Sequence, residues 1–191
     1  MTSDPAAELA ESVRALIDTT IRTLADASTI TSAKAMIDTA TERLAVSLMP
    51  GSFGVYGGAG VSTASGASGN VLIGERNAIA PPLTVVHDDD GSVWCELELG
   101  AGYEGPPGHV HGGVCALILD HVLGAAVHQP GRPAVTGTLT VRYRRGTPLG
   151  HPLRAEARIV RVDGVKTFVS GQITAGGETT VEAEGIFFFP R

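Results

Sequence analysis

The chain has 191 residues, of which 43% are hydrophobic, and this is enough for one globular domain with an additional segment. It carries 20 acidic and 14 basic residues, and the resulting net charge of −6 argues against general nucleic-acid affinity. No apolar run approaches the roughly 20 residues that span a bilayer, the first residues have acids where a signal peptide has bases, and two cysteines are too few for a disulfide framework.

These exclusions predict a soluble, cytoplasmic protein without membrane or nucleic-acid partners. Its first 48 residues are expected to be helical, because apolar side chains recur at steps of three and four residues. Asp26 to Ser28 supply a break and a candidate helix cap. Residues 49–70 are rich in Gly, Ser and Ala and predict a linker, since they offer few large side chains to bury. We therefore expect an N-terminal helical extension over 1–48, a linker over 49–70 and a folded domain over 71–191.

Strands are expected throughout most of the domain. Segments 83–87 and 93–99 are joined by the turn DDDG, which favours a hairpin, and apolar and polar side chains alternate along the second segment. Four more strands are predicted over 134–145, 152–163, 165–175 and 179–189. Because the links between these four are short, the strands should be sequential antiparallel neighbours.

A single long helix is expected among these strands, from His111 to Gln129, with Pro130 and Gly131 ending it. Its apolar side chains point in every direction around the axis, and such a helix must be covered on all sides. The antiparallel sheet is the element available to cover it. The sequence therefore predicts an α+β fold in which a sheet wraps around a long central helix.

Asp120 is the chemically informative residue of this helix. An unpaired carboxylate among apolar side chains is costly, so either a hydrogen bond to a neighbouring strand or to His121 accounts for it, or catalysis does. His111, Gly112 and Gly113 begin the same helix, where the first amides have no partner inside the helix. These amides and the helix dipole form an oxyanion site. Their presence favours a catalytic interpretation of Asp120.

The spacing along the helix predicts how such a site is assembled. Nine residues separate His111 from Asp120, which places them half a turn out of phase and about 13 Å apart along the axis. One helix therefore cannot bring its own first amides and its own Asp120 to one carbonyl group, whereas two antiparallel copies related by a twofold axis can. We expect a homodimer with active sites at its interface. The sequence leaves open whether dimers pair into a dimer of dimers.

Basic residues are concentrated in one part of this acidic chain. Residues 132–166 hold eight basic and two acidic side chains and carry a net charge of +6, so the remainder carries −12. A small polyanion would fit such a zone better than a long duplex. Strands with solvated polar faces would place arginines here as well, and the sequence does not choose between these two interpretations.

The stretch EGPPGHVHGG, followed after six residues by Asp120, resembles hotdog-fold acyl-CoA thioesterases. These form the 4-hydroxybenzoyl-CoA thioesterase superfamily, and the resemblance is greatest to its phenylacetyl-CoA thioesterase-like branch. The segments VTGTLTVRYRRGTPLG and GVKTFVSGQITAGGETTVEAEGIFFF are also similar to strands of that family. The resemblance covers residues 71–191 and implies the hotdog fold, with hydrolysis of acyl-CoA thioesters to a free carboxylic acid and coenzyme A.

The resemblance also implies catalytic roles. Asp120 would act as a general base on water or as a nucleophile that forms a mixed anhydride. The amide of Gly113, together with that of Gly112, would stabilise the oxyanion, and His111 would orient this turn. Thr136 would hold the water or Asp120. Along its strand Thr136 alternates with Thr138, Thr140 and Arg142, which form the polar face; if this face points away from the helix, Thr136 reaches the site only at the edge of the strand.

Coenzyme A is implied as part of the substrate, and no separate cofactor or metal is expected. The resemblance places it along the predicted strand 134–145 and near the start of the predicted strand 165–175; the residues concerned are Arg142, Arg144, Arg145, Lys166 and Thr167. The family often has Asn at the position of Arg142. His109 and His111 stand in a Pro/Gly turn without a carboxylate at ligand spacing, so they do not predict a metal site.

Two other functions remain as alternatives at this point. A hotdog protein can bind acyl-CoA without catalysis, because a fold does not by itself fix an activity. A hydratase acting on enoyl thioesters is the second alternative, and the HGG spacing fits it poorly. The length and aromaticity of the acyl group cannot be derived from the sequence.

Overall fold

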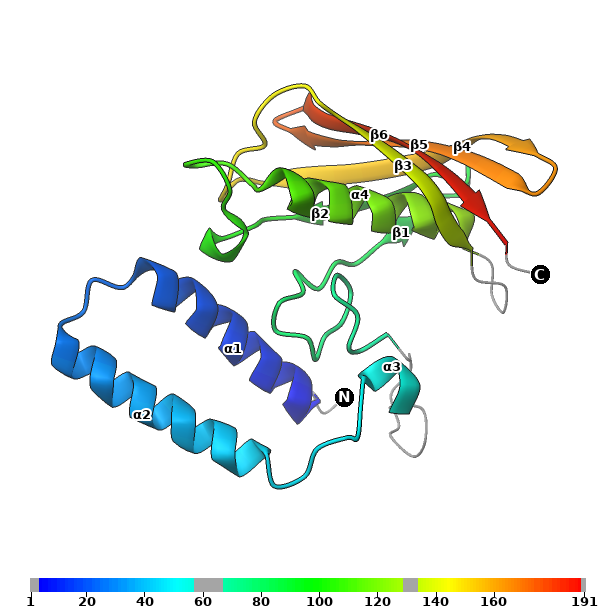
Figure 1. Ribbon diagram of the computed structural model, residues 1–191. Coiled ribbons are helices and arrows are strands. Elements are labelled where there is room, and N and C mark those ends of the chain that lie inside the picture. Colours follow the sequence, from blue (N-terminus) through cyan, green and yellow to red (C-terminus); the bar gives the residue numbers. More distant parts are fainter. Residues whose placement is uncertain (1–3, 57–66, 129–133, 190–191) are drawn as a thin grey trace. The chain divides into compact units, whose positions relative to one another are not determined.

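Two long helices form most of the N-terminal part of the chain (Figure 1). The computed structural model describes residues 4–56, 67–128 and 134–189, and the chain divides into two units, Met1–Ala80 and Pro81–Arg191. In the first unit, α1 spans Pro5–Arg22 and α2 spans Ala27–Leu44. The predicted break between them is confirmed, since the Asp26 side chain caps α2 by accepting a hydrogen bond from the Thr29 N–H at 2.9 Å.

The segment expected to be a linker contains a short helix, α3 (Phe53–Tyr56). The Arg76 guanidinium lies over the Phe53 ring, 5.5 Å from its centroid, and Arg76 also pairs with Asp4 at the start of α1, at 2.9 Å. These contacts hold parts of the first unit together, although α2 has no buried residue. Residues 57–66 of the expected linker lie outside the described residues, and the predicted division at residues 48 and 70 stays a prediction.

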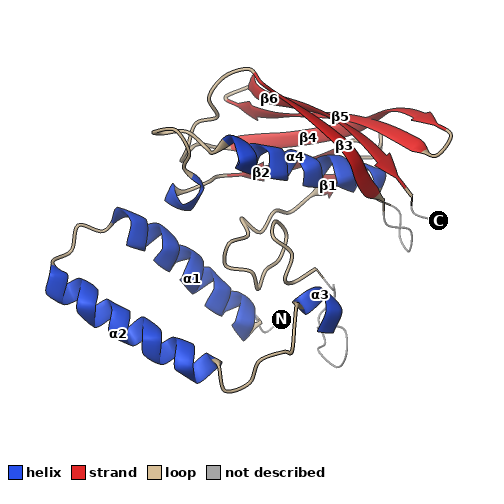
Figure 2. Ribbon diagram, viewed as in Figure 1, coloured by secondary structure: helices blue, strands red, loops and turns tan. Residues whose placement is uncertain are grey.

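The second unit is built on one six-stranded antiparallel sheet (Figure 2). Its strands lie in the order β1-β2-β4-β5-β6-β3. Their bounds are β1 Val86–His87, β2 Val93–Leu97, β3 Val135–Tyr143, β4 Leu153–Asp163, β5 Lys166–Ala175 and β6 Glu178–Phe188. A short 3₁₀ helix, η1 (Ala101–Tyr103), and one long helix, α4 (Gly112–Val127), complete the unit. The predicted α+β fold is confirmed, with a first strand of only two residues. The expectation that the last four strands are sequential neighbours is correct for β4, β5 and β6. It is wrong for β3, because the link from β3 to β4 crosses the sheet and leaves β3 paired with β6.

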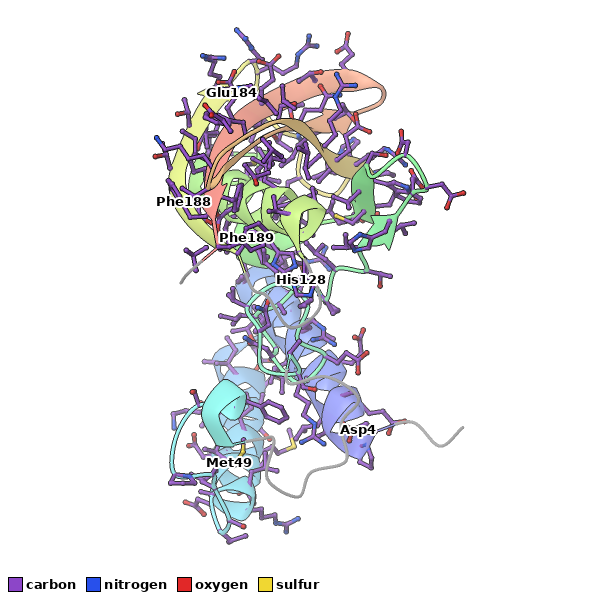
Figure 3. All side chains as sticks on the ribbon, turned by 90° about the vertical axis from the view of Figure 1, so that its right-hand side faces the viewer. Asp4, Met49, His128, Glu184, Phe188 and Phe189 are labelled. Carbon is purple, nitrogen blue, oxygen red and sulfur yellow. The ribbon has the colours of Figure 1, made fainter. Side chains whose placement is uncertain are left out.

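Helix α4 packs along one face of this sheet, which we call the inner face (Figure 3). Leu123 is fully buried there. A Cβ atom added to Gly171 of β5 or to Gly185 of β6 would lie 2.7 Å or 3.0 Å from its methyl groups. The two glycines therefore let the helix approach the sheet closely. Helix α4 ends at Val127, two residues before the expected end at Gln129, because the backbone of His128 is already extended. Pro130 and Gly131, which were expected to end the helix, lie outside the described residues.

The sheet covers only one side of α4. Leu117, on the other side, is 39% exposed, Gly113 is exposed, and Asp120 and His121 are only partly buried. Within the described residues of this unit, the helix is thus not covered on all sides, as its composition predicts that it should be. No helix in the described residues is both long enough and apolar enough to cross a membrane.

Candidate functional site

Asp120 lies in the middle of α4, on the side of the helix that the sheet leaves partly open. The hydroxyl of Thr136, near the start of β3, donates a hydrogen bond to Asp120 Oδ1 at 2.9 Å. Burial lowers the pKa of the neighbouring His121, an effect that the charge of Asp120 opposes, so at neutral pH this imidazole is uncharged. The sequence-predicted pair of Asp120 and Thr136 is therefore in contact in the structure.

A β-bulge directs Thr136 toward α4. Thr136 lies opposite Phe187 of β6, whereas Thr138 lies opposite the next residue, Ile186, so that Gly137 is the extra residue. Because Phe187 is buried against α4, Thr136 lies on the inner face and Thr138 on the outer face. The expectation that these two threonines share one face is wrong, since the bulge interrupts the alternation of the strand.

The amides at the start of α4 are used unequally. His111 is the cap of the helix: its Nδ1 accepts from the Gly113 N–H at 3.0 Å, and its carbonyl accepts from the N–H groups of Val114 and Cys115. The Gly112 N–H has no acceptor among the residues that the structure describes. Of the two amides predicted to stabilise an oxyanion, Gly112 thus has the free donor, while that of Gly113 is occupied by the His111 side chain.

Tyr143, at the end of β3, was not singled out by the sequence. Its hydroxyl donates to the Gly112 carbonyl oxygen at 2.9 Å. The available signal was the alternation of β3, because Tyr143 follows Leu139 and Val141 at steps of two residues. This contact and the Thr136–Asp120 contact tie the two halves of the predicted site to opposite ends of one strand.

Asp120 and the helix start do not meet within one chain. Eight residues separate Gly112 from Asp120, a distance of about 12 Å along the axis. Their contacts on β3, Tyr143 and Thr136, are seven residues apart, or roughly 20 Å in an extended strand. The structure therefore holds the predicted acid and the predicted oxyanion donor on one helix but at separate places.

The arginines predicted to bind coenzyme A each have an acidic partner on β6. Arg142 pairs with Glu184 at 3.1 Å and Arg144 with Glu182 at 2.7 Å, while Arg145 pairs with Glu178. The hydrogen bond from Arg144 holds the pKa of Glu182 below its ordinary value. Glu184 lies on the side of the sheet away from α4 (Figure 3). Much of the positive charge seen in the sequence is thus balanced locally.

Lys166 and Thr167 lie at the other end of the sheet. In the pairing of β5 with β6, Thr167 is opposite Phe187, the residue that also lies opposite Thr136. Thr167 is 3% exposed and faces inward, whereas Lys166 is exposed and makes no ion pair within the described part of the chain. The five residues predicted to bind coenzyme A are therefore divided between the two ends of the sheet.

The outer face of the sheet carries a hollow of about 520 Å³. Its lining mixes both charges; Arg142, Arg154, Glu156, Gln172 and Glu184 contribute to it. Within it the Arg154 guanidinium stacks on Trp94 at 4.1 Å and the Gln172 amide donates to Glu156 at 2.7 Å. Because α4 lies on the inner face, this hollow is separated from Asp120 by the sheet itself.

Both cysteines are buried and unpaired. Burial raises the pKa of the Cys95 thiol to about 11 and also raises the pKa of Cys115. The Cys115 sulfur lies 3.6 Å from the hydroxyl of Thr147, which in turn donates to Thr180 at 2.9 Å. Both thiols are therefore protonated at neutral pH and fill space in the core rather than acting as nucleophiles.

Comparisons with known proteins place this geometry in context. Residues 107–182 match the model of a family described as the thioesterase superfamily. Protein RHA08564, a thioesterase superfamily protein with a known crystal structure, has 33% sequence identity to this chain. The two structures superpose with a TM-score of 0.80 over 98% of this chain and 92% of that chain. The BH2602 protein from Bacillus halodurans, whose crystal structure contains CoA, has 31% sequence identity to this chain. The two structures superpose with a TM-score of 0.54 over 61% of this chain and 79% of that chain.

Curated relatives match about half of the chain. Acyl-coenzyme A thioesterase THEM4 of Xenopus laevis is 32% identical over 95 residues, which are 50% of this chain and 43% of that protein. The protein of the same name from Bos taurus is 28% identical over 103 residues, 53% of this chain and 42% of that protein. The matched part thus spans less than half the length of these curated relatives.

Proposed function

The chain belongs to the thioesterase superfamily, and from this membership we propose that it hydrolyses an acyl-CoA thioester to a carboxylic acid and coenzyme A. The observation that carries the proposal is the hydrogen bond that holds Asp120 on the open side of α4, on the same helix as the free Gly112 N–H. The names of the curated relatives support the reaction, and the CoA in the BH2602 structure supports the ligand.

The reaction needs one base and one oxyanion donor. Asp120 takes a proton from water, the water oxygen forms a bond to the thioester carbon, and the carbonyl oxygen becomes negative near the Gly112 N–H. The carbon–sulfur bond then breaks, and the coenzyme A sulfur leaves as the thiolate and is protonated. In the alternative course Asp120 attacks the carbon itself, and water hydrolyses the resulting mixed anhydride. Thr136 positions the carboxylate in both courses.

We further propose that the active unit is a homodimer in which Asp120 of one protomer acts beside Gly112 of the partner subunit. The separation of about 12 Å along α4 and the uncovered side of this helix, including Leu117, support this arrangement. So does β3, which lies at the edge of the sheet and pairs with β6 on one side only. Such an edge strand readily pairs with a second chain. A dimer of dimers is compatible with the same contacts.

The residues predicted to bind coenzyme A differ in whether their side chains are available to a phosphate group. Lys166 is an exposed cation without an ion pair in the described residues, so it can meet a phosphate directly. Arg142, Arg144 and Arg145 would have to exchange their glutamate partners for phosphate oxygens. Thr167 is buried and would act through packing. We propose Lys166 as the first phosphate contact among these residues.

A panel of acyl-CoAs that varies in chain length and aromaticity tests the function. We expect release of free thiol, measured with a chromogenic thiol reagent, for at least one member. Consumption of enoyl-CoA without thiol would instead indicate hydration. The absence of any turnover, together with a melting temperature raised by acyl-CoA, would indicate a binding protein. Either of these last two results contradicts the proposal.

Thr136→Val should lower kcat by roughly ten- to a hundredfold, because it removes a hydrogen bond to a charged group, which is worth about 1.5–3 kcal/mol. KM should change little, since Asp120 does not bind the acyl-CoA. Thr138→Val removes a hydroxyl from the outer face of the same strand and should leave kcat unchanged. Equal kcat values for the two variants would contradict a role of Thr136 in holding Asp120.

A further inference from the structure

The start of α4 is tied to the sheet by a single tyrosine. The Tyr143 hydroxyl donates to the Gly112 carbonyl oxygen at 2.9 Å. A Cβ atom added to Gly112 would lie 3.2–3.4 Å from the ring and hydroxyl of Tyr143, so the ring lies directly against the glycine backbone. Because Tyr143 is 55% exposed, its contribution to the core is small and the contact with Gly112 is its main interaction.

Two peptide groups flank the Cα atom of Gly112, and hydrogen bonds fix both. In the first, the His111 carbonyl accepts from the Val114 and Cys115 N–H groups at 2.9 Å and 3.2 Å. In the second, the Gly112 carbonyl accepts from Tyr143, and the Gly113 N–H donates to His111 Nδ1 at 3.0 Å. The free Gly112 N–H belongs to the first of these groups. Its direction is therefore set by contacts on both sides.

These contacts also determine the tautomer of His111. Since Nδ1 accepts a hydrogen bond from the Gly113 N–H, the uncharged ring carries its proton on Nε2. His111 is thereby a cap for the helix rather than a competitor for the Gly112 N–H. Among the residues that the structure describes, Tyr143 is the one residue of another element whose side chain hydrogen-bonds to this turn.

We propose that Tyr143 is a positioning residue of the thioesterase site: it holds the Gly112 peptide so that the free Gly112 N–H is already aimed at the oxyanion. This inference rests on the proposed function. Catalysis gains most from donors that need no reorganisation when charge develops. Without the hydroxyl of Tyr143, the Gly112 carbonyl would lose this partner, and the two consecutive glycines would let the peptide group tilt more easily. The tyrosine therefore acts on the transition state without touching the substrate.

Tyr143→Phe removes only the hydroxyl and keeps the ring against Gly112. We expect kcat to fall about tenfold, as for loss of one hydrogen bond of about 1.4 kcal/mol, while KM changes less than twofold. Two unreactive analogues of the best substrate separate positioning from general damage. An S-alkyl-CoA thioether lacks the carbonyl and should bind both proteins equally, whereas a trifluoromethyl ketone analogue, which forms an oxyanion-like adduct, should bind the variant about tenfold more weakly.

Thr138→Val is the matched control, because it removes a hydroxyl from the outer face of the same strand; neither analogue should distinguish it from the wild type. NMR supplies a readout that is independent of activity: the Gly112 and Gly113 amides should become more mobile in Tyr143→Phe and not in the control. Unchanged amide mobility, or an equal loss of affinity for both analogues, would overturn the inference. Wild-type protein that releases no thiol from any acyl-CoA would overturn the proposed function instead, and the NMR result would still decide whether Tyr143 positions the turn.

Discussion

Replacement of Asp120 by asparagine is expected to lower kcat for acyl-CoA hydrolysis at least about a hundredfold, the usual lower limit for loss of a general base. Asparagine has the shape of aspartate and can still accept the hydrogen bond from Thr136, so the fold should be kept. It can neither take a proton from water nor attack the thioester carbon. The effect should therefore appear in kcat, measured by thiol release under saturating acyl-CoA, whichever of the two courses operates.

Asp88→Asn is a suitable control for this experiment. It makes the same chemical change at an exposed turn of the β1–β2 hairpin, and it should leave kcat unchanged. Asp120→Ala should lose as much activity as Asp120→Asn, with melting temperatures of all variants compared to exclude unfolding. Near-normal turnover of Asp120→Asn would show that another group supplies the base and would refute the mechanism.

Most of the second unit could be predicted because its signals are local. The turn DDDG, the short links from β4 to β5 and from β5 to β6, and the apolar run 114–119 each determine the structure of their own segment. The short link from β3 to β4 does not, because β3 pairs with β6 and not with β4. The first strand was expected over 83–87 and forms only at Val86–His87. Composition indicates which residues can form a strand, but the neighbouring strand decides how many of them pair. At the edge of the sheet, β1 has only β2 as a neighbour.

The site shows where local signals are insufficient. Simple alternation along β3 places Thr136 on the same face as Thr138. Only the pairing with β6 reveals that Gly137 is an extra residue between them. A glycine inside a strand pattern indicates a possible bulge, so this signal was present without specifying a direction. The choice between Gly112 and Gly113 as oxyanion donor likewise depended on the rotamer of His111, which sequence spacing does not contain.

The charged residues illustrate a third limit. A count along the chain finds a strongly basic segment over 132–166, because the glutamates that balance it lie farther along the chain, on β6. Antiparallel pairing of β3 with β6 brings Glu182 and Glu184 beside Arg144 and Arg142. Charge clusters in a sequence therefore say little about the surface potential until the strand order is known.

The same topology makes a two-chain site testable without a structure of the dimer. Gly112→Pro removes the free N–H and little else, because proline is favoured at the first position of a helix and His111 already has the extended backbone that precedes proline, with φ −59° and ψ 132°. The Tyr143 ring would have to shift slightly, since an added Cβ lies 3.2 Å from it. Alone, Gly112→Pro and Asp120→Asn should each be nearly inactive, for different reasons.

Mixed dimers of these two variants should regain activity. In such a dimer one site receives both defects, and the other combines Asp120 of the proline variant with Gly112 of the asparagine variant and is intact. Random 1:1 exchange makes about half of the dimers mixed, so the mixture should reach about a quarter of wild-type turnover. Different tags on the two chains allow the mixed dimers to be purified and their number measured. If verified mixed dimers stay as inactive as the parents, each site is built within one chain. That result would contradict the homodimer proposal. It would also mean that Asp120 and Gly112 of one chain, about 12 Å apart along the same helix, do not act on the same thioester carbonyl.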